Sequence, residues 1–120
     1  MIIELPFLAP SVNKCYYTDR NSFTRHKSKA YREFLSKCQI FIKTPKKAIT
    51  EEIEVEINLW FPDKRRRDID NQLKPILDML VYFSIIKDDS LIQKLHVEKY
   101  YKKGEPMTLI ELKLKEFDYS

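Results

Sequence analysis

Residues 52–61 alternate between polar and apolar side chains without a break, and this pattern limits the possible folds more than any other stretch. Because successive side chains of a β-strand point to opposite faces of a sheet, a period of two predicts a strand with one buried face. The buried face carries Ile53, Val55, Ile57, Leu59 and Phe61. We interpret the glutamates between them as the solvated face, and we expect a fold built around this strand.

Two helices are predicted, one before and one after that strand. Ser28 is suited to cap the first, whose apolar side chains recur at helical spacing until Pro45 limits the helix. The second follows Asp70 and has apolar residues at i, i+3, i+4, i+7 and i+8, namely Leu73, Ile76, Leu77, Leu80 and Val81. Pro75 complicates its start, because proline lacks an N–H donor and disfavours α geometry in the residue before it. Either the regular helix begins near Pro75, or its first turn is distorted.

Shorter strands are predicted towards both ends of the chain. Residues 1–5 form the first, and Pro6 ends it. Residues 95–101 and 110–114 alternate as strands do, and the turn at 102–106 indicates a hairpin between them. The order β-α-β-α-β-β predicts an α/β (α+β) fold, with a single mixed sheet of about four strands and two helices packed on it. We expect residues 1–120 to form one domain.

Composition excludes several classes of function. The chain has one glycine in 120 residues, whereas phosphate-binding loops and dinucleotide fingerprints need several, so we expect no nucleotide cofactor. His26 and His96 have no partner at metal or catalytic-triad spacing. Cys15 and Cys38 match no zinc spacing, and we expect reduced thiols in a cytoplasmic protein. No apolar run approaches the ~20 residues that span a bilayer, so no membrane association is expected.

Charge is concentrated in residues 64–89. The candidate site residues among these charges are Lys64, Arg65, Arg66, Arg67, Asp68, Asp70, Lys74, Asp78, Asp88 and Asp89. In extended geometry Asp68 and Asp70 point to the same side, and two close carboxylates repel unless a cation lies between them. Mg²⁺ prefers such oxygen ligands, Mn²⁺ is the alternative, and Asp89 or Asp88 would complete the set. We therefore predict a divalent-metal site that activates water for phosphodiester cleavage.

Each of these residues also has a purely structural interpretation. Aspartates ahead of a helix cap its amides, and Arg–Asp strings form surface ion pairs worth about 0–1 kcal/mol each. Lys74 is either a group that neutralises the transferred phosphate or an i, i+4 partner of Asp70. Asp88-Asp89 alone is typical of a turn, and Asp78 is a peripheral ligand or, as we favour, a solvated residue. The conjunction of cations, carboxylate pairs and lysine within one strand–helix–loop unit favours a functional site.

Nucleic acid is the partner that the cations predict. If three or four of residues 64–67 each neutralise a phosphate, log K against log[salt] has a slope of roughly −3 to −4. Residues 13–25 are polar and aromatic, and they are either a solvated loop or a second contact surface. In the second case Asn13, Lys14 and Tyr17 grip the backbone and stack on unpaired bases.

Residues 61–71, Phe-Pro-Asp-Lys-Arg-Arg-Arg-Asp-Ile-Asp-Asn, resemble the central motif of the RusA family of Holliday junction resolvases. Lys74, Asp78 and Asp88-Asp89 follow in step, and the Pro, Asn and Tyr residues of 5–17 match the family's opening more loosely. The resemblance covers nearly the whole chain. It implies that Asp68, Asp70 and Asp89 are the catalytic metal-binding aspartates and that Lys74 is the catalytic lysine.

The same resemblance implies a homodimeric, Mg²⁺-dependent endonuclease. Such an enzyme binds four-way DNA junctions and resolves them by paired symmetric nicks, in DNA recombination and repair. A junction is two-fold symmetric, so two identical sites suit it. Two alternatives stay open: a nuclease for other branched DNA, and a non-catalytic, structure-selective DNA-binding protein.

Overall fold

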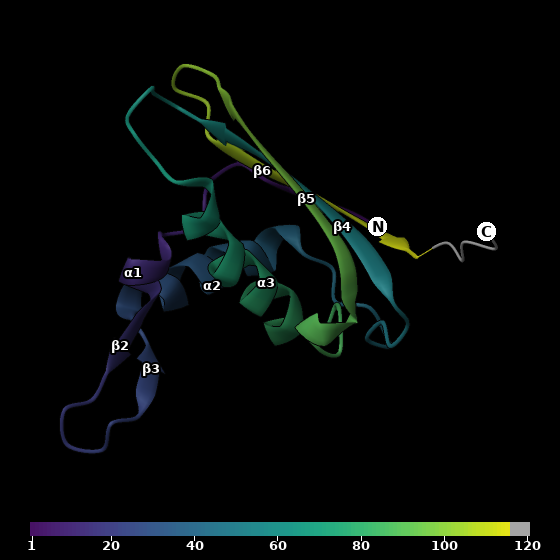
Figure 1. Cartoon of the computed structure of the whole chain (residues 1–120), viewed down its shortest axis with the longest axis horizontal. Coiled ribbons are helices and arrows are strands. Elements are labelled where there is room, and N and C mark those ends of the chain that lie inside the picture. The colour runs from purple at the N-terminus through teal and green to yellow at the C-terminus, as the bar shows by residue number, and fades with distance from the viewer. Residues whose placement is uncertain (116–120) are drawn as a thin grey trace.

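The structure, a computed structural model, describes residues 1–115 and contains a four-stranded mixed sheet with helices on one face (Figure 1). The strands are β1 (Ile2–Leu5), β4 (Ile53–Phe61), β5 (Ile92–Tyr101) and β6 (Met107–Leu114). They lie in the order β1-β6-β4-β5. β4 is antiparallel to β6 and parallel to β5, while β1 is antiparallel to β6. The predicted mixed sheet is therefore confirmed.

The alternating stretch forms β4, which has a neighbour on each side. Its five apolar side chains are at most 5% exposed, while the side chains between them, three polar residues and Trp60, are half-buried on the face that no helix within residues 1–115 covers. A strand in this position satisfies its backbone on both edges and buries its apolar face under the helices. The sheet is thus centred on the strand that the sequence pattern singled out.

Two longer helices cover the apolar face of the sheet. They are α2 (Lys29–Phe41) and α3 (Leu73–Tyr82). Ser28 caps α2, because its Oγ accepts a hydrogen bond from the Tyr31 amide at 3.1 Å. Two short 3₁₀ turns, η1 (Ile69–Gln72) and η2 (Asp89–Leu91), precede α3 and β5 respectively. No helix within residues 1–115 is long and apolar enough to cross a bilayer.

Pro75 lies inside the first turn of α3, two residues after its start at Leu73. The first N–H groups of a helix have no intrahelical partner, so a proline at this position sacrifices no hydrogen bond. The chain enters α3 through η1, in which the tighter 3₁₀ geometry replaces a regular first turn. The predicted distortion is therefore real and lies just ahead of the proline.

The prediction that the last two strands form a hairpin is wrong. β5 and β6 lie on opposite sides of β4, so their connection crosses the end of β4. The connection is held there because Lys102 N donates to Phe61 O at 2.9 Å and Gly104 N donates to Pro62 O at 3.0 Å. Gly104 supplies the left-handed backbone that the crossing needs, with φ of 69°.

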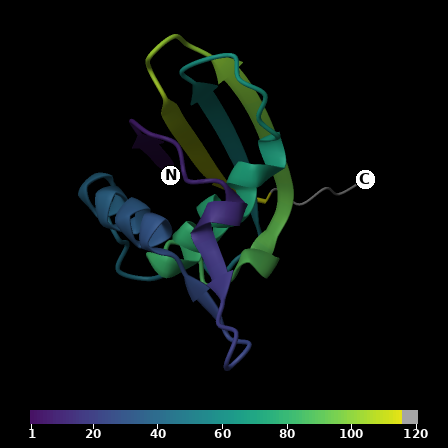
Figure 2. The same cartoon turned by 90° about the vertical axis from the view of Figure 1, so that its left-hand side faces the viewer.

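The segment 13–25 is more ordered than a solvated loop. It contains α1 (Val12–Cys15) and most of a hairpin of β2 (Tyr16–Thr18) and β3 (Arg25–Lys27). The hairpin projects away from the sheet and helices, as the two perpendicular views show (Figures 1 and 2). Each strand has only three residues and neither has a buried alternating face, so the hydrophobic pattern gave no strand signal.

Candidate functional site

The loop between β4 and η1 is shaped by an ion pair inside the basic run. Both guanidinium Nη atoms of Arg67 donate to the Asp63 carboxylate, at 2.6 and 3.1 Å, and the Arg65 amide donates to it at 3.0 Å. These contacts, with the Arg67 hydrogen bonds first, lower the pKa of Asp63 to about 2. Arg67 also lies over the Phe61 ring, 5.1 Å from its centroid. Arg67 therefore orders the loop, and the Arg65 side chain lies near the same carboxylate, with its Nε 4.0 Å from Asp63 Oδ2.

Asp68 and Asp70 lie where this loop enters η1 and α3. Both side chains are exposed. Asp68 is the N-cap of η1, yet its side chain accepts no capping hydrogen bond. Within residues 1–115, neither carboxylate has a hydrogen-bond or ion-pair partner. The geometry does not support the interpretation that these aspartates are caps and ion-pair partners.

The donor set of this loop fits a divalent cation. The two carboxylates lie two residues apart, and both are exposed and have no partner within residues 1–115. Mg²⁺ is typically bound by one or two carboxylates of the protein and keeps several water ligands. Asp68 also lines a cavity of about 290 Å³ with Ser11, Phe61, Arg66, Arg67, Asn71 and Gln72. In this cavity the Asp68 carboxylate could bind a metal ion, and an arginine side chain could bind a phosphate beside it.

Lys74 is held by residues that the sequence did not connect to it. Its Nζ lies 3.4 Å from Asp78 Oδ2, one helical turn further along α3, and 5.6 Å from the centroid of the Tyr16 ring. The Tyr16 hydroxyl donates to the same Asp78 oxygen. Burial, followed by this hydrogen bond, raises the pKa of Tyr16, so the phenol remains a donor. Asp78 is thus a half-buried anchor for Lys74, not a solvated residue.

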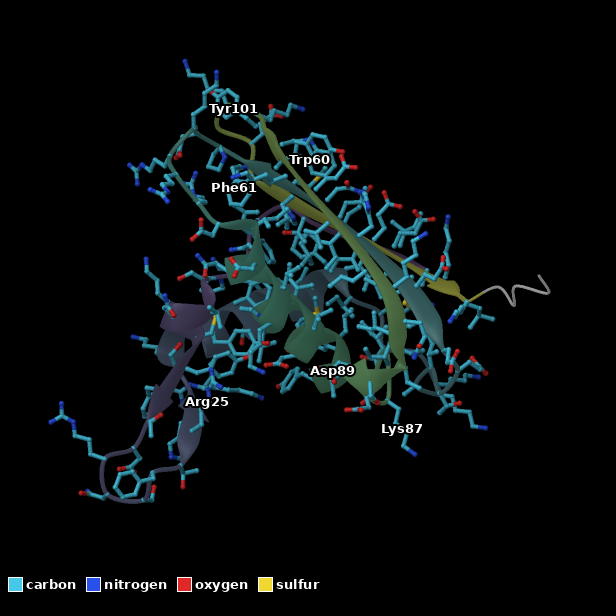
Figure 3. The ribbon with its side chains drawn as sticks, in the orientation of Figure 1. Arg25, Trp60, Phe61, Lys87, Asp89 and Tyr101 are labelled. Carbon is cyan, nitrogen blue, oxygen red and sulfur yellow. The ribbon has the colours of Figure 1, made fainter. Side chains whose placement is uncertain are left out.

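The structure places Asp88 and Asp89 away from the first aspartate pair. They follow α3, whereas Asp68 and Asp70 precede it, and the ten residues of α3 span about 15 Å. Figure 3 shows Asp89 beside Lys87 at one end of the sheet and Phe61 at the other. No group of three His, Cys, Asp or Glu side chains in residues 1–115 is arranged to hold a metal. A single chain does not bring Asp89 to the Asp68–Asp70 pair.

The two residues of the second pair differ in their contacts. Asp88 is the N-cap of η2 and accepts from the Ser90 amide at 3.2 Å and from the Ser90 hydroxyl. These bonds, the hydroxyl first, lower the pKa of Asp88. Asp89 is exposed, and its carboxylate has no partner within the described residues. Asp88 therefore has the structural role of a cap, and Asp89 is the carboxylate left available.

Gln72 fixes the N-terminal segment against the site. Its side-chain amide is buried and makes two bonds to Ala9, accepting from the backbone N–H at 3.0 Å and donating to the carbonyl at 2.7 Å. This pairing brings Ser11 to the cavity beside Asp68. A single glutamine between Asn71 and Leu73 carries no sequence signal of its own. Only the packing shows its role.

The predicted nucleic-acid contacts fall into two groups. Lys64, Arg65 and Arg66 are exposed on the loop after β4, with Lys64 Nζ 5.2 Å from the Tyr101 ring centroid. Asn13, Tyr17 and Arg25 line a second cavity, of about 320 Å³, at the base of the hairpin. Lys14 is exposed on α1.

Glutamates outnumber lysines around a cavity on the opposite face of the sheet. Glu54, Glu56 and Glu111 line a cavity on the sheet face that no helix covers, together with Lys94, His96 and Lys113. Because three glutamates and two lysines line this cavity, it has a small excess of negative charge, and the net charge of +4 comes from the rest of the molecule. Both cavities with predicted DNA contacts and the Asp68–Asp70 pair lie away from the glutamates, which favours approach of an anionic partner to the helical side.

Comparison with known proteins gives a consistent result. Residues 7–113 match the model of the family described as Endodeoxyribonuclease RusA. The Crossover junction endodeoxyribonuclease RusA of Aquifex aeolicus is 41% identical over 66 residues. That alignment covers 55% of this chain and 52% of the relative, so it spans about half the length of each.

Proposed function

The chain belongs to the RusA family of endodeoxyribonucleases, and on that basis we propose that it is a Mg²⁺-dependent nuclease for branched DNA. Its substrate is the four-way junction, which it resolves as a homodimer by paired symmetric nicks during recombination and repair. The relative from Aquifex aeolicus carries the name crossover junction endodeoxyribonuclease, which supports this choice of substrate. Other branched DNA is a second substrate class that the same site would accept.

The observation that carries the proposal is the pair of unpartnered carboxylates at the start of α3. Asp68 and Asp70 are exposed beside a run of cations, yet neither pairs with one of them within residues 1–115. The arginine nearest to them in sequence, Arg67, is instead paired with Asp63. Two carboxylates kept free next to cations indicate that their partner is a ligand, and a divalent metal is the ligand that suits them.

Each residue of the site has a role in hydrolysis. A bound Mg²⁺ at Asp68 and Asp70 would supply activated water and charge stabilisation to an in-line phosphodiester displacement. Lys74, held in place by Asp78, puts a cation one helical turn from Asp70, where it neutralises negative charge on the phosphate or the leaving oxygen. Arg66 shares the cavity with Asp68 and holds the neighbouring phosphate.

The shape of the molecule favours branched over linear DNA. The projecting hairpin and the basic loop present two separate contact surfaces on the helical side of the sheet (Figures 1 and 2). Phe23 lies between the two strands of the hairpin and is 82% exposed, so most of its ring is open to solvent. An exposed aromatic ring stacks on unpaired bases, which a branch point offers and a continuous duplex does not.

The proposal is tested by separating binding from cleavage. Asp70→Asn keeps the size of the side chain, so the chain still folds, and it removes one metal ligand. We expect loss of junction cleavage with unchanged or tighter junction binding, because a negative charge leaves the phosphate path. Glu4→Gln on β1 also removes one exposed negative charge but lies away from the proposed metal ligands, so it is the matched control and keeps full cleavage. Junction binding by the wild type without cleavage would favour a non-catalytic binding protein.

A further inference from the structure

A cavity of about 740 Å³ lies between β3, α2 and the end of α3, and the proposed reaction does not use it. Its polar lining residues are Lys27, Arg32, Ser36, Gln39, Thr44 and Ser84. No acidic side chain within residues 1–115 lines this cavity. Two cations with several hydroxyl and amide donors, and without a carboxylate, favour an anionic ligand that accepts many hydrogen bonds.

The two cations of this cavity have no acidic partner in the described part of the chain. Lys27 and Arg32 are exposed, and neither forms an ion pair within residues 1–115. Glu33, the acid next to Arg32 in the sequence, has its Oε1 3.9 Å from Lys29 Nζ. Lys27 Nζ lies 4.5 Å from the centroid of the Tyr82 ring, and an aromatic face attracts a cation without neutralising it. Both charges are thus available to a ligand.

The cavity lies at the end of a row of cations that begins at the proposed catalytic lysine. Lys74 Nζ lies 5.6 Å and Arg25 Cζ lies 4.5 Å from the centroid of the Tyr16 ring, so these two cations are neighbours. Arg25 and Lys27 are two residues apart on β3, so they share one face of the strand, about 6.6 Å apart. Figure 3 shows Arg25 where the hairpin meets the helices. We call Lys74, Arg25, Lys27 and Arg32 the cationic row.

The length of α3 gives the spacing along this row. Lys74 is in the first turn of α3, and Tyr82, whose ring Lys27 contacts, is its last residue. Tyr82 therefore lies about 12 Å from Lys74 along the helix axis. Phosphates of one DNA strand follow each other every ~3.4 Å of the duplex axis, so this length corresponds to roughly four phosphates. A strand whose scissile phosphate is at Lys74 reaches Lys27 about four nucleotides further on.

We propose that the cationic row binds the backbone of one duplex arm of the junction, and that Lys27 and Arg32 hold phosphates about three to five nucleotides from the scissile one. The inference deepens the proposed function and rests on it, because the scissile phosphate is placed at Lys74. Contacts to phosphates fix the orientation of a protein on DNA without reading its sequence. An anchor at this distance sets the angle of the arm and thereby holds the scissile phosphate beside Asp68 and Asp70.

A polyanion fits the row better than a small anion does. All four cations are exposed, and together they extend beyond the ~12 Å between Lys74 and Tyr82, whereas a single phosphate group reaches only one or two of them. The other donors of the cavity, among them Ser36 and Thr44, are of the kinds that bind DNA phosphates beside lysine and arginine. The row therefore matches a backbone that carries one charge per nucleotide.

Neutral phosphates test the position of the contact. Uncharged methylphosphonates replace the phosphates around the mapped nick one at a time, and junction binding is measured in EDTA. Apart from the scissile region, we expect wild-type affinity to fall several-fold only about three to five nucleotides to one side of the nick. The double variant Lys27→Gln/Arg32→Gln should bind the unmodified junction more weakly and lose no further affinity at those positions. Its slope of log K against log[salt] should be shallower by about 1.8, for two lost phosphate contacts.

Lys113→Gln/Lys115→Gln is the matched control, because it removes the same charge from exposed positions at the end of β6, away from the row, and it should keep the wild-type pattern. Equal sensitivity of the wild type and the Lys27→Gln/Arg32→Gln variant at those positions would overturn the contact. Unchanged binding with a lower melting temperature would overturn it too, since Lys27 would then only balance the C-terminal end of α3, whose last turn has no basic residue. A wild type that binds the junction in this assay but never nicks it in Mg²⁺ would instead overturn the proposed function.

Discussion

Lys74 pairs with Asp78, one turn along α3, with its Nζ 3.4 Å from the Asp78 carboxylate, and not with Asp70. The Tyr16 hydroxyl donates to the same oxygen of that carboxylate. The N-terminal part of the chain is thereby connected to the proposed catalytic lysine. Asp78 and Tyr16 are positioning residues in this arrangement, because they act on the phosphate only through Lys74.

Asp78→Asn is expected to slow cleavage without weakening binding. The amide keeps the size of the side chain but loses the charge that orients Lys74, so we predict a fall of about tenfold in the single-turnover rate, which corresponds to ~1.4 kcal/mol. Tyr16→Phe, which removes only one hydrogen bond, should cost less. Tyr82→Phe, at an exposed tyrosine at the end of α3, is the matched control. Equal losses in cleavage rate and in junction affinity would show that Asp78 stabilises the fold and does not orient Lys74.

Gln72→Met is expected to destabilise the fold by about 1–3 kcal/mol, because the Ala9 N–H and carbonyl are left buried without a partner. Methionine retains much of the volume and the helical propensity, so the hydrogen bonds are the main loss. Urea unfolding should show a lower midpoint with an unchanged slope. Gln39→Met, on an exposed position of α2, is the control. Equal midpoints for the two variants would contradict the bridging role.

The sequence predicted most reliably those helices and strands that bury one face. The period of two predicted β4, and the helical spacing predicted α2 and α3, because burial requires apolar residues at fixed intervals. Strand neighbours could not be predicted in the same way. The turn after Tyr101 indicated a hairpin, yet β4 lies between β5 and β6, since the turn bonds to Phe61 and Pro62 at the end of β4.

Arg66 and Arg67 are expected to differ in the salt dependence of binding. Arg66 is exposed at the cavity beside Asp68, whereas Arg67 is engaged by Asp63. Arg66→Ala should reduce the slope of log K against log[salt] by about 0.9 for each lost phosphate contact. Arg67→Ala should lower affinity through disorder of the loop and change the slope less. Titrations of a fluorescent junction at several salt concentrations measure both, and equal slope changes would contradict the assignment.

The Asp63–Arg67 pair predicts a specific pH dependence. Hydrogen bonds from Arg67 lower the pKa of Asp63 from 3.8 to about 2. The stabilisation is therefore fully present above pH ~4, and it is lost as the pH falls through about 2. The difference in melting temperature between the wild type and Asp63→Asn should disappear over that range. A difference that stays constant from pH 5.5 to pH 2 would contradict it.

The candidate site was only partly readable from the sequence. The motif of residues 61–71 indicated the carboxylates and cations. It gave no way to distinguish the roles of the four basic residues 64–67. Their roles depend on where each side chain points, and Arg67 is turned to Asp63. The Tyr16–Asp78 and Gln72–Ala9 contacts join residues more than sixty positions apart, so no local sequence pattern could predict them. The position of Asp89 followed only from the packing of α3.

The most direct test of the account compares a synthetic four-way junction with a linear duplex of the same sequence, each with Mg²⁺ or with EDTA. Sequencing gels would map the nicks on all strands. The account predicts symmetric nicks on opposing strands near the branch point, only on the junction and only with metal, and their absence in Asp70→Asn. Tight junction binding with no cleavage in Mg²⁺ or Mn²⁺ would contradict it, and so would cleavage that continues in EDTA.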